Sequence, residues 1–448
     1  MARLYIETCF SLGVYFQEAH MVEGEENQTN QDEEFVEEGE EESSLSTFLI
    51  PFSVAVATRA ASFAYSDFYE ERVEFTSTVY SFERVKDGVA MLEDGLDPFE
   101  SKNMHFPPLT LYLFRFLLNT APNLLVPLWI LMDVGTAWMT SRAAQTVWER
   151  IHGKGDREIR KIGKLVFILY AYSPIAIIST GILSLTVVQN FVFSAIFLFF
   201  VSDRPAACAL LIGAWSSFTI FPFTLISCLV FRSNGSILKF LYLLLLSLIS
   251  AATFFTLNFL LNGNNLNFIE PVYTSILNFT SIQPNVGLYW YFFVQIFEHF
   301  RSFYTNSFVI LYFFMPIPIT FMIRRDAVLH FTIIGLLASI FFPYPTLNQV
   351  SFILAILPLH EAYKKHFRYT LLIGGTIITT IALMPVMWHM WIVSQSGNAN
   401  FFFGATIVYN VALINLVMDM IFVYSRRQID LEYSDTLQTK TKMDFAFY

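Results

Sequence analysis

Residues 237–259 read ILKFLYLLLLSLISAATFFTLNF, with Lys239 as the one charged residue, and this stretch decides the fold class. A helix needs about 20 apolar residues to cross the hydrocarbon core of a bilayer. The whole chain has 448 residues, of which 55% are hydrophobic and 14% charged, whereas soluble proteins carry about 25% charged residues. The sequence therefore predicts an all-α, polytopic integral membrane protein, and it excludes a soluble globular one.

Further apolar stretches follow the same pattern along the chain. We predict about twelve transmembrane helices, and this number counts the run 206–232 as two short helices because Phe221-Pro222 interrupts it. The segment 107–119 is too short and too charged to span, and we expect an interfacial or re-entrant helix there. The other spans are expected near 45–64, 121–140, 165–183, 187–202, 302–323, 327–342, 346–361, 369–391 and 401–424.

Lys and Arg residues predict how these spans are oriented, because cytoplasmic loops carry an excess of both. The most basic loop lies between the spans 121–140 and 165–183, so we place it in the cytoplasm. Arg324, Arg325, Lys364, Lys365, Arg368, Arg426 and Arg427 then also fall on the cytoplasmic side, together with both termini. The expected lumenal segments are 65–106, 260–300 and 394–400.

Two tails are expected outside the membrane domain, which covers residues 45–425. Residues 1–44 hold thirteen acidic residues and one basic residue. High charge with few aromatic residues is typical of a disordered, solvated tail, although an acidic binding arm stays open as an alternative. Residues 426–448 are expected to form a cytoplasmic C-terminal tail.

Sites of modification and of metal binding have few signals in the sequence. Asn278-Phe279-Thr280 is an N-glycosylation sequon on the expected lumenal side, but its closeness to apolar sequence counts against occupancy. The sequons at Asn27 and Asn234 fall on the cytoplasmic side. The three cysteines have no metal-ligand spacing, so we expect neither a metal site nor a disulfide framework.

A few ionisable residues lie within spans, where they are costly and usually face a protein interior. Arg59 and Asp133 are expected to form a buried structural pair, which we favour over contact with a ligand. His330, His360 and His389 lie at or near the ends of spans. We expect them to be packed or solvated residues rather than ligands.

Two polar or aromatic segments are candidates for ligand binding. The loop QSGNAN (395–400) lies between WHMW (388–391) and FFF (401–403), and its amide groups suit phosphate oxygens, sugar hydroxyls or an ammonium group. A simple turn between helices is the alternative. The stretch YWYFFVQIFEHF (289–300) predicts either an aromatic belt or the wall of a lipid groove. The candidate groove residues are Trp290, Phe293, Phe297, Glu298, His299, Phe401 and Phe402.

Several segments together resemble one family, the PIG-U family of subunit U of the glycosylphosphatidylinositol (GPI) transamidase complex. The residues that carry the resemblance are AVATRAASF (55–63), ERVE (71–74), GLDPFES (95–101), PPLTLYLFRFLL (107–118), PNVGLYWYFFVQIFEHF (284–300), YPT (344–346) and PVMWHMWIVSQSGNANFFF (385–403). The matches are spread over most of the chain from residue 45 to residue 427.

This family is similar in turn to the GT-C glycosyltransferases, so the resemblance implies a GT-C-like scaffold. Those enzymes use a carboxylate in the first lumenal loop as catalytic base. The same region here reads DFYEERVE (67–74) and contains no D-x-D motif, although Asp67, Glu70, Glu71 and Glu74 supply carboxylates. The resemblance therefore implies a glycosyltransferase scaffold reused to hold a glycolipid.

The resemblance implies a non-catalytic subunit in the endoplasmic reticulum membrane that binds and presents the GPI anchor. The catalytic Cys and His would belong to a separate caspase-like subunit, and precursor proteins with C-terminal GPI signals would be further partners. The family's N-x-N-F-F motif matches Asn398, Asn400, Phe401 and Phe402, which implies that the two asparagines contact the GPI headgroup. Lys239 and Arg324 are candidates for contact with anionic phospholipid. No cofactor, metal or nucleic acid is expected.

Two other functions remain as alternatives. One is a GT-C mannosyltransferase that uses dolichol-phosphate mannose, for which replacing Asp67 or Glu70 by alanine would abolish activity. The other is a small-solute transporter, which predicts an internal repeat of broken spans. The two halves of the sequence show no convincing self-similarity.

Overall fold

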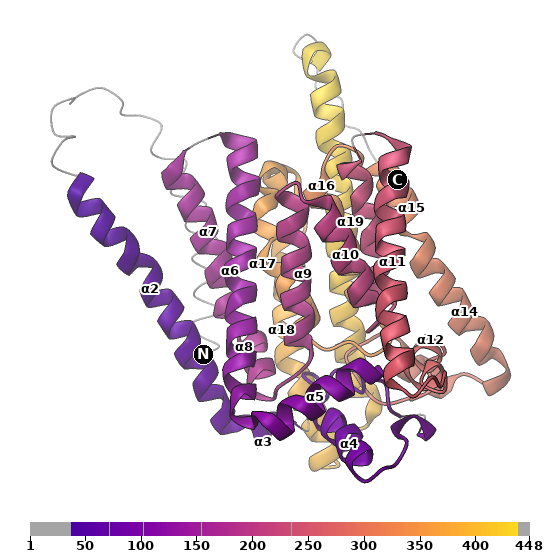
Figure 1. Ribbon diagram of the computed structural model, residues 1–448. Coiled ribbons are helices and arrows are strands. Elements are labelled where there is room, and N and C mark those ends of the chain that lie inside the picture. Colours follow the sequence, from indigo (N-terminus) through magenta and orange to yellow (C-terminus); the bar gives the residue numbers. More distant parts are fainter. Residues whose placement is uncertain (1–36, 71, 102, 154, 234, 438–448) are drawn as a thin grey trace.

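The computed structural model describes residues 37–437 except 71, 102, 154 and 234. Helices and short connections make up this part of the chain, and no β-strand occurs within it. The long helices run side by side between two ends of the molecule (Figure 1). The predicted all-α class is confirmed.

Five helical segments in the described part of the chain are long and apolar enough to cross a bilayer. A sixth would be α7 (Asp156–Ala171) and α8 (Pro174–Gly181), if this pair, bent by 50° at its break, forms one span. These helices support a polytopic membrane protein, whereas the predicted number of twelve spans stays a prediction. Four of the segments contain α6 (Leu125–His152), α11 (Ile237–Leu261), α14 (Glu298–Phe314) with α15 (Pro316–Met322), and α18 (Thr370–Trp388), and the fifth is the part of α19 (Ala399–Leu437) that ends at Glu432.

Shorter apolar helices fill the space between the long ones. Proline is the first or second residue of three of them, α10, η4 and η6, because its fixed φ suits the first turn of a helix. The predicted break at Phe221-Pro222 is present, since one helix ends at Ser216 and the next begins at Phe221. The short elements are α9 (Thr186–Val201), α10 (Pro205–Ser216), η4 (Phe221–Arg232), α16 (Ala327–Ile340), α17 (Asn348–Ala355) and η6 (Leu357–His366).

Three short helices gather at the lower end of the molecule in Figure 1. They are α3 (Ser66–Glu70), α4 (Phe82–Glu93) and α5 (Pro108–Thr120). The last of them corresponds to the predicted non-spanning segment 107–119. Its Leu113 and Phe116 side chains are exposed, as expected for a helix at the surface of a membrane.

The predicted tails differ from the structure at their boundaries. α2 (Glu37–Ser62) begins inside the segment 1–44 that we expected to be disordered, and residues 1–36 of that segment lie outside the described residues. At the other end, α19 continues to Leu437, so the expected C-terminal tail begins as part of a helix.

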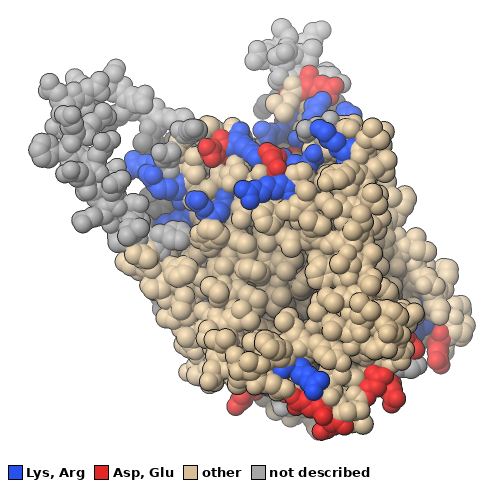
Figure 2. Space-filling model, viewed as in Figure 1, with Lys and Arg blue, Asp and Glu red and all other residues tan. Residues whose placement is uncertain are grey.

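Charged residues divide the molecule into two ends (Figure 2). Most Lys and Arg side chains in this view gather at the upper end, and a band without charge separates them from the acidic lower end. At the upper end, which we call the basic end, Asp203 is bonded to Arg150 at 2.6 Å and to Arg232 at 2.7 Å. The basic residues for which the sequence predicts a cytoplasmic position thus lie mostly at one end of the molecule.

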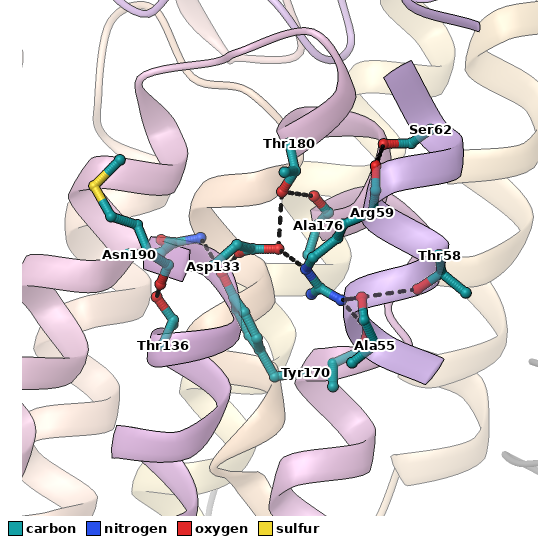
Figure 3. A network of polar contacts seen from close by, with 12 residues as sticks. Ala55, Thr58, Arg59, Ser62, Asp133, Thr136, Tyr170, Ala176, Thr180 and Asn190 are labelled. Atoms are coloured by element: carbon teal, nitrogen blue, oxygen red, sulfur yellow. Dashed lines mark hydrogen bonds and ion pairs between the residues drawn. The ribbon is translucent and has the colours of Figure 1, made fainter. Parts of the chain in front are cut away.

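A buried polar network joins α2, α6, α7 and α8, four helices from the N-terminal half of the chain (Figure 3). Arg59 of α2 donates through Nε to Asp133 Oδ2 of α6 at 2.6 Å, and both side chains have no exposed surface. Tyr170 donates to Asp133 Oδ1 at 2.7 Å and Thr180 donates to Oδ2 at 2.9 Å. The predicted buried pair is confirmed.

The same network also satisfies the break between α7 and α8. Helix ends leave carbonyl groups without intrahelical partners. Arg59 Nη1 donates to the carbonyl of Ala171, the last residue of α7, at 2.8 Å. The guanidinium group therefore neutralises the buried carboxylate of Asp133 and also satisfies the carbonyl group at the end of α7.

Candidate functional site

A groove of about 400 Å³ lies at the end opposite the basic end, and it brings together the two candidate segments of the sequence. One wall comes from the aromatic stretch that begins at residue 289, and the other comes from the amide loop that precedes α19. These segments lie about a hundred positions apart in the chain. The lining residues are Ile282, Pro284, Trp290, Tyr291, Val294, Gln295, Trp391, Asn398, Ala399 and Asn400.

The amide loop is positioned by an irregular end of α18. After Trp388 the chain makes one π-helical turn, η7 (His389–Val393). The backbone N–H groups of Ser396 and Gly397 then both donate to the carbonyl of Met390 at 3.0 Å. Wide turns of this kind occur mostly as single turns and often lie at functional sites. This turn places Trp391 against the groove while the loop reverses direction.

Asn398 begins α19. Its Oδ1 accepts a hydrogen bond from the backbone N–H of Asn400 at 3.0 Å, which is the geometry of an N-cap. The Oδ1 atom of Asn398 therefore caps the helix, as the interpretation of this loop as a turn between helices expects. Asn398 as a whole is exposed and lines the groove.

Asn400 links the loop to the aromatic wall. Its Oδ1 accepts a hydrogen bond from the hydroxyl group of Tyr291. Both residues line the groove, and the Asn400 side chain is exposed. The contact fixes the orientation of the amide, so that its nitrogen remains the group available to a ligand.

The aromatic wall is formed by α13 (Tyr289–Gln295). Trp290 and Val294 are four residues apart and so share one face of this helix. The Trp290 ring is stacked on Trp391, with ring centroids 6.1 Å apart and an interplanar angle of 17°. Its indole N–H is buried and has no hydrogen-bond partner. A buried donor without a partner costs about 1–3 kcal/mol, and the indole N–H of Trp215 is in the same state elsewhere in the described residues.

Other predicted groove residues lie elsewhere. Phe293 is buried, packs on Phe279 with ring centroids 5.3 Å apart and lines a separate cavity of about 20 Å³. Phe297, Glu298 and His299 come after the extended residue that ends α13 and are exposed, Phe297 by 73%. None of the four lines the groove.

The two phenylalanines of the N-x-N-F-F motif have different environments. Phe402 is fully buried and packs on Trp388 at 5.2 Å, so it supports the aromatic wall from behind. Phe401 is 53% exposed and lines a second, apolar groove of about 540 Å³ between α18 and α19. Because Phe401 follows Asn400 directly, the polar and the apolar groove are neighbours.

Sequence reasoning missed two important groove residues. Tyr291 lies inside the aromatic stretch, three residues before Val294. This helical spacing would have indicated that the two side chains share a face. Trp391 was noted only as a neighbour of the loop. Its contact with Trp290 depends on the π-helical turn, for which the sequence has no signal.

The remaining polar candidates are placed as follows. His330 and His360 are buried and contact the hydroxyl groups of Thr320 and Thr332, each at 2.9 Å, so they are packed as expected. His389 is exposed. Lys239 and Arg324 are exposed at the basic end, and their contact with phospholipid stays a prediction.

Carboxylates of the first expected lumenal loop do not gather at the groove. Asp67 is exposed, and Glu71 lies outside the described residues. Burial, together with the neighbouring Glu83, raises the pKa of the half-buried Glu70. Glu74 is completely buried, neither of its carboxylate oxygens has a partner, and burial raises its pKa. Within the described residues no three His, Cys, Asp or Glu side chains are placed to hold a metal ion.

Comparisons with known proteins agree with this picture. Residues 52–409 match the family model described as GPI transamidase subunit PIG-U. The chain is 28% identical to the human GPI-anchor transamidase component PIGU, over 86% of this chain and 95% of the relative. It is 25% identical to the GPI transamidase component GAB1 of Saccharomyces cerevisiae, over 81% and 89% respectively. Since the family model covers well over half of its length, the chain belongs to the PIG-U family of GPI transamidase subunits.

Proposed function

We propose that this chain is a non-catalytic, multi-pass subunit of GPI transamidase in the endoplasmic reticulum membrane, and that it binds and presents the GPI anchor. The headgroup of the glycolipid binds in the groove beside Asn398 and Asn400, on the lumenal side. Both termini lie in the cytoplasm. Its partners are the other subunits, including a caspase-like catalytic subunit, and precursor proteins with C-terminal GPI signals. The apolar surface of this chain is also suited to contact those signals.

The observation that carries the proposal is the groove with its polar groups left available. Its lining contains no charged side chain, only aromatic, aliphatic and amide groups. The amide nitrogens of the exposed Asn398 and Asn400 can donate to phosphate or sugar oxygens, and the buried indole N–H of Trp290 becomes a further donor once a small movement of the ring exposes it. Aromatic faces attract an ammonium group. Such a lining suits a zwitterionic headgroup that carries both phosphate and amine.

The neighbouring apolar groove supports a lipid rather than a free solute as the ligand. It is lined by residues of α18 and α19, such as Leu383, Met387 and Val408, together with small residues that leave room. Because Asn400 and Phe401 are adjacent in the chain, one molecule can place a polar headgroup in the first groove and a hydrocarbon chain in the second. No bound structural phospholipid is required for this arrangement, although the basic end offers a place for one.

Positioning, and not covalent catalysis, is the role that fits the available groups. Two pairs of a nucleophile type and a histidine occur in the described residues: Ser275 Oγ lies 3.1 Å from His105 Nδ1, and Cys228 Sγ lies 3.5 Å from His330 Nδ1. All four side chains are buried, and none lines either of the two grooves. Holding a reactant in the correct geometry can by itself contribute several kcal/mol to a transfer reaction.

The mannosyltransferase alternative lacks a comparable observation. It requires an ionised carboxylate at a substrate groove, yet none of the first-loop carboxylates lines the groove beside Asn398. The replacement of Asp67 or Glu70 by alanine distinguishes the two functions. We expect these variants to retain activity, whereas loss of activity with normal assembly would favour the enzyme.

The proposal is tested by replacing Asn398 and Asn400 together with alanine in cells that lack their own subunit. Assembly is measured by co-purification of the complex, and function by surface display of a GPI-anchored reporter. We expect normal assembly and a loss of display of at least tenfold, because two hydrogen bonds to a charged headgroup contribute about 1.5–3 kcal/mol each. Full display with intact assembly would contradict headgroup binding at this loop.

Two further variants separate binding from folding. Ser394 and Ser396 lie in the same loop, are exposed and contact each other at 2.8 Å, but they do not line the groove. Their double replacement by alanine is the matched control and should leave display unchanged. Asn398→Ser, combined with Asn400→Ala, keeps an N-cap oxygen for α19. This variant should assemble like the wild type and still lose display.

A further inference from the structure

Of the three N-glycosylation sequons of the chain, only that of Asn278 lies wholly within the described residues, since Asn27 and Asn234 are outside them. Arg232, two positions before Asn234 in the sequence, is bonded to Asp203 at the basic end. Asn278 belongs to the connection between α11 and α13, and α11 begins next to the basic end and leads away from it. Asn278 and Arg232 therefore lie at opposite ends of α11.

The local backbone turns the sequon of Asn278 outward. α12 (Ser275–Leu277) ends at Asn278, whose backbone N–H donates to the carbonyl of Thr274 at 2.8 Å. The next residue, Phe279, has a φ of +52° and a buried side chain that is stacked on Tyr344 at 4.9 Å. This anchored middle residue holds the chain reversal in place.

Both recognised side chains of this sequon remain accessible. Asn278 and Thr280 are exposed on either side of the buried Phe279. The side-chain amide of Asn278 takes part in no contact with another described residue. The hydroxyl group of Thr280 makes only a long contact of 3.4 Å to the carbonyl of Ser275. The apolar residues Ile276 and Phe279 at the sequon are buried, whereas Asn278 and Thr280 are exposed.

We propose that Asn278 is an N-glycosylation site. Its Nδ2 attacks the anomeric carbon of the first sugar of a lipid-pyrophosphate-linked oligosaccharide, the bond from that carbon to the pyrophosphate oxygen breaks, and one amide proton passes to a base. The lipid pyrophosphate is the leaving group. Glycosylation of Asn-X-Ser/Thr requires a surface position on the secretory side. The inference rests on the orientation given in the proposed function, but not on headgroup binding.

The test expresses the full chain in eukaryotic cells and compares its electrophoretic mobility before and after treatment with a peptide-N-glycosidase. The wild type should shift by the mass of one glycan. Asn278→Gln and Thr280→Ala should abolish the shift, whereas Thr280→Ser should keep it, because serine preserves the sequon. Asn234→Gln is the matched control and should leave the shift unchanged.

Other outcomes would overturn the inference in distinct ways. A wild-type chain without any shift would exclude a glycan at Asn278 and would leave the groove untouched, since reporter display tests the groove separately. A shift that persists in Asn278→Gln and disappears in Asn234→Gln would overturn the site and also reverse the proposed orientation. Co-purification of Asn278→Gln with the complex shows whether the variant is folded.

Discussion

The buried network around Asp133 and the groove beside Asn398 are both polar, but they differ in how their groups are satisfied. At Asp133, three donors from three other helices meet one carboxylate at 2.6–2.9 Å. At the groove, the indole N–H of Trp290 has no partner, and the loop asparagines are exposed. The carboxylate of Asp133 has its partners within the chain, although Arg59 Nη2 in the same network is buried without one, whereas the exposed asparagines at the groove keep their side-chain amide nitrogens for solvent or a ligand.

This difference distinguishes structural from binding roles among polar residues in an apolar chain. Burial of an ionised group is tolerated when a counter-charge and hydrogen bonds accompany it. A donor at a groove without a partner is instead suited to a ligand that brings an acceptor. Substitutions in the network should therefore affect folding and assembly, and substitutions in the groove should affect function in an assembled complex.

The largest expected effect is that of Asp133→Ala. It leaves the guanidinium group of Arg59 buried without a counter-charge, which costs about 3–5 kcal/mol. We expect a strong loss of folded protein, measured as the monodisperse fraction in fluorescence-detected size-exclusion chromatography. Asp203→Asn is the control, because its ion pairs with Arg150 and Arg232 are partly exposed and such pairs contribute about 0–1 kcal/mol. Equal behaviour of the two variants would show that the network is not structural.

A smaller effect is expected for Trp290→Phe, which keeps an aromatic ring but removes the indole N–H. If that group donates to an anionic headgroup oxygen, its loss costs about 1.5–3 kcal/mol. Reporter display should fall by about tenfold or more while co-purification of the complex is unchanged. Trp388→Phe is the matched control, since Trp388 packs in the same aromatic cluster but does not line the groove. Reduced display in both variants alike would point to a packing role.

The smallest effect concerns Glu74, which is unpartnered and yet lies at none of the grooves described. Burial raises the pKa of its carboxyl above the ordinary value of 4.5, so the folded protein binds this proton more tightly than the unfolded chain. Its contribution to stability is therefore most favourable below about pH 4.5 and declines as the pH rises above that value. Glu74→Gln should remove this decline and raise thermal stability at pH 8 by on the order of 1 kcal/mol.

Thermal unfolding of the purified complex at pH 5.5 and pH 8 measures this effect. The exposed Glu100 provides the control, because Glu100→Gln should not alter the pH dependence. Retained reporter display in Glu74→Gln would also show that an ionised carboxylate is not needed there. Greater stability of the wild type than of Glu74→Gln at pH 8 would mean that the carboxylate has a partner after all.

Much of the fold was predictable from the sequence because lipid imposes strong conditions on composition. The continuous apolar run of α11 and the proline at residue 222 each predicted their element within a few residues. Helix bends were harder to predict from the sequence. The break between α7 and α8 is stabilised by Arg59 from a distant helix, and no local pattern contains that contact.

The candidate site was predictable only in part. Asn398, Asn400 and Trp290 were singled out by composition and resemblance, and the structure places all three at one groove. Phe293, Phe297, Glu298 and His299 belonged to the same aromatic stretch but lie outside that groove. Phe293 is three residues from Trp290 and therefore its neighbour on the helix surface, but its side chain packs on Phe279 in the core, and the end of α13 separates the other three from the groove. Composition finds such a stretch, whereas the direction of each side chain depends on where the helix begins and ends.

The π-helical turn at residues 389–393 makes the length of this segment as important as its composition. Such a turn holds one residue more than an α-helical turn does. Deletion of a single residue there would restore a regular helix and rotate everything before it by about 100° relative to the loop. Trp391 would then lose its position over Trp290 although every side-chain type had been kept. Substitutions within residues 389–393 should therefore be tolerated more readily than any change in the number of residues.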